Sequence, residues 1–387
     1  MNLDLIKIES SATVAINSLA LQKRQAGERV YNLSVGEPMI DTPEVIKAGA
    51  IQALAENKTH YPPVFGLVEL KNEAVKWFNK SFQANYNSDE VLVTVGGKFG
   101  IYLALQSLVK IGDEILIISP YWVSYPAMVK IFGGVPKIVE TEAENDWKVS
   151  INDLQKQVSN KTKILILNNA GNPTGVLYDK VEIVNILKFA KENNLLVLSD
   201  EVYSGLVYDK QEFVSCASFA EYKDRLVVIQ SCSKNLAMTG WRVGFVFAPV
   251  ELIKTLTNLT SQSTSGVTSI SQYSALAGLQ NIDTIALEIN KTMQKRRDWF
   301  VNAFNKLFKT NIKLPASSLY CFIPISAFGT DEIDSAGFCE QILSEANVAM
   351  VPGIAFGQEG YVRCSFGENI EELDQALLKL AEYLKNK

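Results

Sequence analysis

The stretch that decides the fold is an apolar run that leads into a polar turn, Leu226-Val227-Val228-Ile229-Gln230-Ser231-Cys232-Ser233-Lys234-Asn235-Leu236-Ala237-Met238-Thr239-Gly240-Trp241-Arg242-Val243-Gly244. The β-branched run 226–229 predicts a buried strand. A lysine, two serine hydroxyls and an arginine follow it. A phosphorylated aldehyde needs this set, because an amine can form a Schiff base while hydroxyls and a guanidinium bind phosphate. Taken alone, the motif could equally be a polar turn with a surface lysine and arginine.

Length and composition bound the class of protein. A chain of 387 residues can form two or three domains, or one large α/β unit with a smaller partner. The formal net charge of −5 gives no electrostatic reason to expect nucleic acid or an anionic membrane as a partner. The amino terminus is too acidic for a signal peptide, and no apolar run approaches the roughly 18 residues of a transmembrane helix.

Cysteine and histidine usage exclude several chemistries. Five cysteines with no C-x-x-C pair argue against a disulfide framework or a zinc site, and they favour a reducing, cytoplasmic location. The single histidine, His60, lies in an expected loop, and one histidine cannot form a multi-histidine metal site. We therefore expect no metal, and proton transfer would have to come from a lysine, a tyrosine or a carboxylate.

Six short apolar runs predict the strands of one sheet. They cover residues 91–95, 114–118, 164–167, 195–198, 226–229 and 243–247, and apolar spacing in 99–108 predicts a helix. Uninterrupted apolar runs indicate strands that are covered on both faces. The predicted class is therefore α/β, with a mostly parallel mixed sheet flanked by helices. Ligands of such sheets bind beyond the carboxyl ends of the strands.

Polar residues follow four of these strand ends. Strand 91–95 leads into Gly96-Gly97-Lys98 and a helix start, where the backbone can approach a ligand and unpaired N–H groups suit an anion. The other three ends carry Asn172, then Asp200 with Tyr203, then Lys234 with Arg242. We expect these side chains to meet at one edge of the sheet.

The alternation of apolar strands and helices changes after about residue 285. A helix rich in lysine and arginine, 293–308, leads into a region with short strands at 348–351 and 361–366 and a terminal helix from residue 370. This predicts a second, smaller α+β domain. We expect a large domain over 41–284 and a small domain made of 1–40 and 285–387.

Stretches typical of a known family occur in order along nearly the whole chain. They are residues 11–17 (SATVAIN), 36–38 (GEP), 61–66, 96–98 (GGK), 119–126 (SPYWVSYP), 171–175 (GNPTG), 200–203 (DEVY), 231–244 and Arg363. On these residues the chain resembles fold-type I pyridoxal-phosphate (PLP) aminotransferases of class I, and within them the bacterial aspartate/prephenate aminotransferase subgroup. One such motif is a weak signal, whereas the ordered set is strong.

The resemblance implies a PLP cofactor bound through Lys234. This lysine would form a Schiff base with the cofactor, and its freed amine would then move the proton of the substrate Cα. A crowded cationic pocket lowers the pKa of a lysine, which suits a base near neutral pH. Asp200 would pair with the pyridine nitrogen and keep it protonated. Tyr203 and Asn172 would donate hydrogen bonds to the phenolic oxygen.

The resemblance also assigns contacts to the phosphate and the ring. The phosphate contacts are Ser231, Ser233, Arg242 and the backbone N–H groups of Gly97 and Lys98. Trp122 would stack on the pyridine ring. Tyr61 would reach the same phosphate from a neighbouring subunit, which implies a homodimer with shared active sites.

Substrate contacts follow from the same resemblance. Arg363 would grip the substrate α-carboxylate with its planar fork. Assisting contacts are expected from Gly36, Trp122 and Asn172. Lys98, Ser11 and Thr13 occupy the places that recognise the distal carboxylate of acidic substrates in the subgroup. The implied reaction is ping-pong transfer of an amino group between L-aspartate, or another acidic amino acid, and 2-oxoglutarate.

Several positions depart from the family pattern. Ala170 stands where a proline is common, and Phe99 replaces a glutamine beside the substrate pocket. Residues 318–322 (SLYCF) replace a Gly-Ala-Phe-Tyr stretch that lines the mouth of the site. Tyr125 stands where a histidine supports the pyridine-binding carboxylate in other subgroups. Phe99 and 318–322 leave the preferred substrate side chain open.

Other interpretations remain. Within the class, a prephenate, aromatic or broad-range aminotransferase fits the departures at Phe99 and 318–322, whereas a PLP lyase lacks a residue for the leaving group. A PLP-binding regulator would need a helix-turn-helix segment or a basic patch, and the sequence has neither. A nucleotide-binding oxidoreductase would need G-x-G-x-x-G after the first strand, and it would leave the Lys234 segment unexplained.

Overall fold

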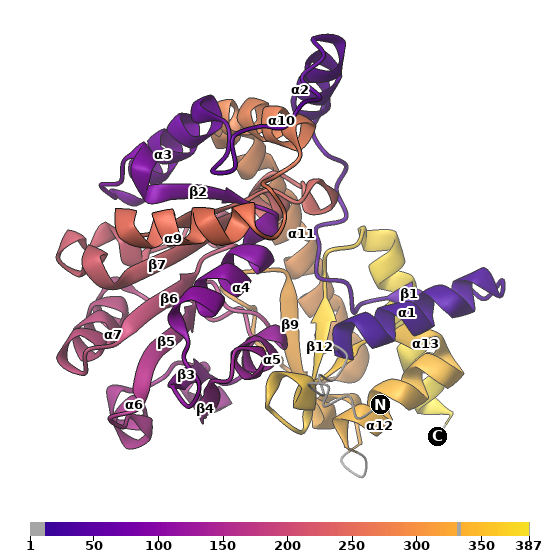
Figure 1. The fold of residues 1–387 in the computed structure, drawn as a ribbon. Coiled ribbons are helices and arrows are strands. Elements are labelled where there is room, and N and C mark those ends of the chain that lie inside the picture. The colour runs from indigo at the N-terminus through magenta and orange to yellow at the C-terminus, as the bar shows by residue number, and fades with distance from the viewer. Residues whose placement is uncertain (1–11, 331–333, 387) are drawn as a thin grey trace, which may run out of the picture.

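A computed structural model of the chain describes residues 12–330 and 334–386. Its largest element is a seven-stranded sheet (Figure 1). In spatial order the strands are β2 (Val91–Thr94), β8 (Gly244–Phe247), β7 (Leu226–Ser231), β6 (Leu196–Asp200), β5 (Thr162–Asn168), β3 (Glu114–Ile118) and β4 (Val135–Val139). Neighbouring strands are parallel except at β8, which runs antiparallel to both β2 and β7. The predicted α/β class with a mostly parallel mixed sheet is confirmed.

Helices cover both faces of this sheet, because successive apolar side chains of a strand point to opposite faces and both faces must be buried. Val91 and Val93 pack into one apolar cluster, whereas Leu92 between them packs into a second. The first cluster includes helices α3 (Val68–Phe82), α7 (Lys180–Glu192), α10 (Ser269–Gln280) and α11 (Ile282–Phe308). The second includes α4 (Gly96–Leu108), α5 (Ser124–Ile131) and α9 (Val250–Ser261). Burial on both faces explains why these strands are unbroken apolar runs in the sequence.

In the large sheet the six predicted strands occur within two residues of their expected positions, and one further strand was missed. That strand is β4 at the edge of the sheet, next to β3. Pro136 and Lys137 interrupt its apolar pattern, and Val135 is 44% exposed. An edge strand tolerates proline and lysine because one side of its backbone is unpaired.

The helices also match the sequence pattern in part. The helix predicted over 99–108 is α4, which begins at Gly96, and the terminal helix is α13 (Ile370–Lys385). The helix predicted over 293–308 is the second half of α11, which has 27 residues. Within the described ranges, no helix combines the length and the apolar character needed to cross a membrane.

Two smaller sheets lie beside the large one. Strands β11 (Val351–Pro352), β12 (Tyr361–Ser365) and β9 (Tyr320–Pro324) form an antiparallel sheet, and β1 (Tyr31–Asn32) pairs in parallel with β10 (Val348–Ala349). The single strand predicted at 348–351 is therefore two strands in different sheets. Helices α1 (Ala12–Gln25), α12 (Ser335–Gln341) and α13 gather around them (Figure 1). The pairing of β1 with β10 supports a small domain of 1–40 and 285–387, and these boundaries stay a prediction.

The remaining helices connect these layers. They are α2 (Glu44–Ala55), α6 (Ile151–Gln157) and the short α8 (Cys232–Asn235). Helix α2 packs against α10. Because β8 is antiparallel to both of its neighbours, β2 and β7 run in the same direction as β5 and β6. The carboxyl ends of these four strands therefore open at one edge of the sheet.

Candidate active site

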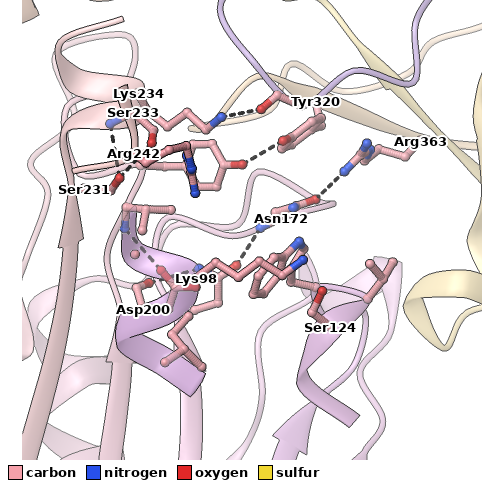
Figure 2. Close-up of a pocket in the computed structure, with 18 residues that line it drawn as sticks. Lys98, Ser124, Asn172, Asp200, Ser231, Ser233, Lys234, Arg242, Tyr320 and Arg363 are labelled. Atoms are coloured by element: carbon pink, nitrogen blue, oxygen red, sulfur yellow. Dashed lines mark hydrogen bonds between the residues drawn. The ribbon is translucent and has the colours of Figure 1, made fainter. Parts of the chain in front are cut away.

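A cavity of about 300 Å³ lies where the ends of β5, β6 and β7 face strands β9 and β12 (Figure 2). The structure brings most of the predicted site residues into its lining: Gly36, Gly97, Lys98, Trp122, Asn172, Asp200, Tyr203, Ser231, Ser233, Lys234, Arg242 and Arg363. Tyr61 is not among them, and it is 94% exposed. Ser11 lies outside the described residues, and Thr13 lies in the first turn of α1 with a side chain that is not described.

One end of the cavity is built for an anion. Helix α4 begins at Gly96 with no side-chain cap, so its first N–H groups remain available to a ligand. A Cβ atom at Gly96 would lie 2.5 Å from the Arg242 guanidinium, so a glycine is needed for this close approach. The hydroxyl of Ser231 donates to Ser233 Oγ at 3.0 Å. Within the described chain, Arg242 has no carboxylate partner, and it donates to the Thr239 carbonyl at 2.7 Å.

The Lys234 amine lies between this end and the smaller sheet. Its Nζ donates a hydrogen bond to the carbonyl oxygen of Gly36 (Figure 2). Burial lowers the pKa of Lys234 to about 8, with Glu37 opposing the shift and Arg242 and Arg363 adding to it. A larger neutral fraction makes this amine both a better nucleophile and a better base near neutral pH than an exposed lysine.

Asp200 is a buried carboxylate that has no cationic partner among residues 12–330 and 334–386. The hydroxyl of Tyr125 donates to its Oδ2 at 2.6 Å, and the Val202 N–H donates to its Oδ1 at 3.3 Å. Burial raises the pKa of Asp200 to about 6, although both hydrogen bonds lower it. Tyr125, which departs from the family pattern, thus contacts the carboxylate directly. A cationic ligand group beside Asp200 would stabilise its charged form.

Arg363 is the opposite case, a buried cation with no carboxylate partner in the part of the chain that the structure describes. It is 2% exposed, and its two terminal nitrogens donate to Asn172 Oδ1 at 3.1 Å and to the Ser34 carbonyl at 2.6 Å. Its guanidinium lies 4.2 Å from the ring centre of Tyr320 and 5.0 Å from that of Phe356. Its Nε has no partner in the described part of the chain. A ligand carboxylate would compensate this charge.

Lys98 occupies the open side of the cavity. Its amine lies 5.1 Å from the ring centre of Trp122, and Figure 2 shows it near Ser124. Much of its side chain is exposed, while partial burial of the amine and the nearby Arg242 lower its pKa. Lys98 is therefore a second cation that faces the cavity, held by fewer contacts than Arg363.

Phe99 and the stretch 318–322, which both depart from the family pattern, differ in their position relative to the cavity. Phe99 does not line the cavity, contrary to expectation, and its ring stacks on Tyr102 with centres 5.9 Å apart. From the altered stretch 318–322, Tyr320 lines the cavity, whereas Phe322 stacks on Tyr361 with centres 5.0 Å apart. Only Tyr320 of that stretch can therefore contact a ligand in the cavity directly.

Sequence reasoning missed several residues that line the cavity. They are Ile101, Val123, Ser124, Asn168, Val202 and Tyr320. Asn168 had a signal, since it directly follows the apolar core of a predicted strand, and its side chain accepts a hydrogen bond from the Asn172 N–H at 2.8 Å. Tyr320 belongs to the stretch 318–322, which the resemblance placed at the mouth of the site, but no local pattern singled it out, because its contacts come from distant parts of the chain.

A lysine of lowered pKa now lies between an anion site, a buried carboxylate and a buried arginine. The family model described as "Aminotransferase class I and II" matches residues 28–380. The chain belongs to this family. A probable aspartate/prephenate aminotransferase from Aquifex aeolicus is 35% identical over 98% of this chain and 97% of its own length.

Solved structures of this family agree in fold. The structure of aspartate aminotransferase from Thermus thermophilus with maleate has a TM-score of 0.93 and 33% identity, covering 98% of this chain and 100% of the other. An aromatic aminotransferase from Pyrococcus horikoshii has a TM-score of 0.88 and 33% identity, covering 95% and 99%. The chain is thus an aminotransferase.

Proposed function

We propose that this aminotransferase uses PLP and moves an amino group between L-aspartate, or another acidic amino acid, and 2-oxoglutarate by a ping-pong mechanism. One observation carries the proposal. The Lys234 amine, with its lowered pKa, shares a cavity with a buried anion, Asp200, and a buried cation, Arg363, and the described chain provides neither with an opposite charge. A ligand that is cationic at one end and carboxylated at the other satisfies both.

The residues present fit PLP. Ser231, Ser233, Arg242 and the free N–H groups at Gly97 and Lys98 would hold the phosphate. Asp200 would pair with the protonated pyridine nitrogen, whose charge would offset the burial of the carboxylate. Trp122 would cover the ring, and Tyr203 and Asn172 would bond the phenolic oxygen. When bound, PLP supplies an aldehyde that accepts amino groups and a ring that withdraws electrons from the substrate Cα.

The chain's own residues would bind the substrate and move its proton. The Arg363 fork, oriented by Asn172 and Ser34, would bind the α-carboxylate in two parallel hydrogen bonds. That contact would fix the substrate Cα within reach of the Lys234 amine. Lys234 would take the Cα proton as a neutral base and, as an ammonium, would hold that proton for delivery to the C4′ carbon of PLP.

The distal carboxylate of an acidic substrate would face Lys98. Its amine lies in the cavity over the face of Trp122, and it is close enough to Arg242 for that cation to lower its pKa. Ser11 and Thr13 would add hydroxyl contacts from the amino-terminal segment. A Thermus thermophilus relative was solved with maleate, a dicarboxylate, which supports an acidic substrate here.

A second candidate is a prephenate, aromatic or broad-range aminotransferase. Ile101, Val123 and Tyr320 give the cavity apolar and aromatic walls that a ring could pack against. Relatives named for aspartate and prephenate, and one named for aromatic substrates, support this alternative.

We also propose a homodimer with shared active sites. Tyr61 is 94% exposed and lies outside the cavity of its own chain, as a residue that serves a second copy would. A cytoplasmic location stays a prediction. It is supported by five cysteines that are all free and buried, as is usual in a reducing compartment.

Trapping the bound cofactor tests the proposal. The purified protein is loaded with PLP, reduced with borohydride and digested, and the modified peptide is identified by mass spectrometry. We expect the label on Lys234, together with oxaloacetate production from aspartate and 2-oxoglutarate by the unreduced sample. A label on another lysine, such as Lys98, or no label at all, would contradict the assignment.

A further inference from the structure

Tyr320 of β9 lines the cavity, and Figure 2 shows it between Lys234 and Arg363. Its hydroxyl is 2.7 Å from the hydroxyl of Tyr203, and the two rings meet edge to face at 5.8 Å. The Arg363 guanidinium lies over its ring at 4.2 Å. Tyr320 thus contacts one residue expected to bind the cofactor and one expected to bind the substrate.

The position of the Tyr320 hydroxyl is tightly defined. A Cβ atom at Gly36 would lie 2.5 Å from it, so the hydroxyl occupies space that only a glycine leaves free. The carbonyl of the same glycine accepts the hydrogen bond of Lys234. Tyr320 is 1% exposed and Tyr203 is 5% exposed, so water has little access to their hydrogen bond.

Counting protons fixes the direction of this hydrogen bond when the cofactor is present. A tyrosine hydroxyl has one proton to donate. If Tyr203 donates its proton to the phenolic oxygen of PLP, its oxygen can only accept in the 2.7 Å pair, and Tyr320 must be the donor. Consecutive hydrogen bonds polarise one another, so each strengthens the next.

We propose that Tyr320 is a positioning residue, whose hydroxyl donates to Tyr203 and strengthens the hydrogen bond from Tyr203 to the phenolic oxygen of PLP, while its ring keeps Arg363 in place. This role rests on the proposed function. The hydroxyl of Tyr320 would act on the cofactor contact made by Tyr203, and its ring would act on the substrate contact made by Arg363.

A pH titration tests the role of the hydroxyl. The absorbance band of lysine-bound PLP is followed as the pH is changed, in Tyr320→Phe, in Tyr203→Phe and in the double variant. Because a hydrogen bond to the phenolic oxygen favours the deprotonated form of lysine-bound PLP, we expect Tyr203→Phe to raise the apparent pKa of that band. Tyr320→Phe should raise it less, by about 0.5 pH unit. The double variant should match Tyr203→Phe alone, because Tyr320 acts through Tyr203. Tyr86→Phe, which removes a buried hydroxyl with no partner in the described chain, should cause no shift.

The ring is tested with maleate as a dicarboxylate probe. Tyr320→Phe keeps the ring under Arg363 and should bind maleate as the wild type does, whereas Tyr320→Leu should bind it about tenfold more weakly. A wild-type titration curve for Tyr320→Phe would overturn the role of the hydroxyl. So would an equal shift from that substitution in the Tyr203→Phe background. If the wild-type protein shows no band of lysine-bound PLP, the proposed function fails, and this role fails with it.

Discussion

Two of the cations that line the cavity, Arg363 and Lys98, differ in how they are held. Arg363 is 2% exposed, bonded to Asn172 and Ser34, and packed between two aromatic rings. The Lys98 side chain is exposed, and within residues 12–330 and 334–386 its amine has no hydrogen-bond or carboxylate partner and lies over the face of Trp122. A preorganised group loses little freedom when it binds, whereas a loose one must be ordered by the ligand. The comparison suggests that Arg363 fixes the common part of all substrates, while Lys98 adjusts the range of side chains.

Removing the Lys234 amine should have the largest effect and should lower the turnover of every substrate alike. We expect Lys234→Ala to lower turnover of aspartate and phenylalanine alike by at least about 10³-fold, because both the amine that binds PLP and the base are lost. Circular dichroism should show an unchanged fold. Lys254→Ala, at an exposed lysine on α9, is the matched control and should keep full activity. Turnover by Lys234→Ala near the wild-type level would disprove the role of Lys234.

Replacing Arg363 should lower kcat/KM equally for every substrate. We expect Arg363→Lys to lower kcat/KM about 100-fold for both aspartate and phenylalanine, because an ammonium cannot reproduce the planar fork at a buried site. The ratio of the two kcat/KM values should stay at its wild-type value. Arg29→Lys on the surface is the control. A loss confined to aspartate would show that Arg363 binds the distal carboxylate instead.

Removing the Lys98 amine should change the ratio of kcat/KM for aspartate to kcat/KM for phenylalanine. We expect Lys98→Ala to lower kcat/KM for aspartate about tenfold more than for phenylalanine, the effect of one charged hydrogen bond. Lys98→Arg, which keeps the charge, should recover part of the loss. Steady-state kinetics with both substrates measure the ratio directly. Equal losses for the two amino acids would mean that Lys98 does not contact the distal carboxylate.

The smallest expected effect is a pH dependence of the same ratio. Burial and Arg242 lower the pKa of Lys98, so its positive charge is lost at a lower pH than that of an ordinary lysine. As the pH rises through that pKa, kcat/KM for aspartate should fall relative to that for phenylalanine, because only aspartate needs the charge. Groups that act on both substrates cancel in the ratio. In Lys98→Ala the ratio should not change with pH, and a persistent slope would point to another group.

The large sheet and its polar edge could be predicted because the signals are local. Strands buried on both faces give unbroken apolar runs, and Asp200 and Lys234 follow such runs within a few residues. The neighbouring carboxylates Asp200 and Glu201 show the limit of this reasoning. Asp200 lines the cavity, whereas Glu201 is fully buried and bonded to Ser199, Ser215 and the Cys216 N–H. No sequence pattern separated the two; the resemblance to the family did.

The substrate half of the site could be predicted only from the family resemblance. Arg363 gains its place from Ser34, 329 residues earlier, and from Asn172, 191 residues earlier. Tyr320 pairs with Tyr203 across 117 residues, so neither periodicity nor spacing indicates the contact. Phe99 was misplaced for a related reason. Its position next to Lys98 suggested the cavity, but successive residues of a helix point in different directions, and its ring packs on Tyr102 one turn later.

One titration tests the central claim most directly. The absorbance of the PLP-loaded protein is followed while aspartate is added, and in a separate sample while phenylalanine is added. We expect a band of lysine-bound PLP that aspartate removes at a lower concentration than phenylalanine does, because Lys98 and Arg363 would together bind both carboxylates of aspartate. If phenylalanine is the more effective, the aminotransferase chemistry stands and the role of Lys98 is wrong. If no such band forms, the assignment of Lys234 is contradicted.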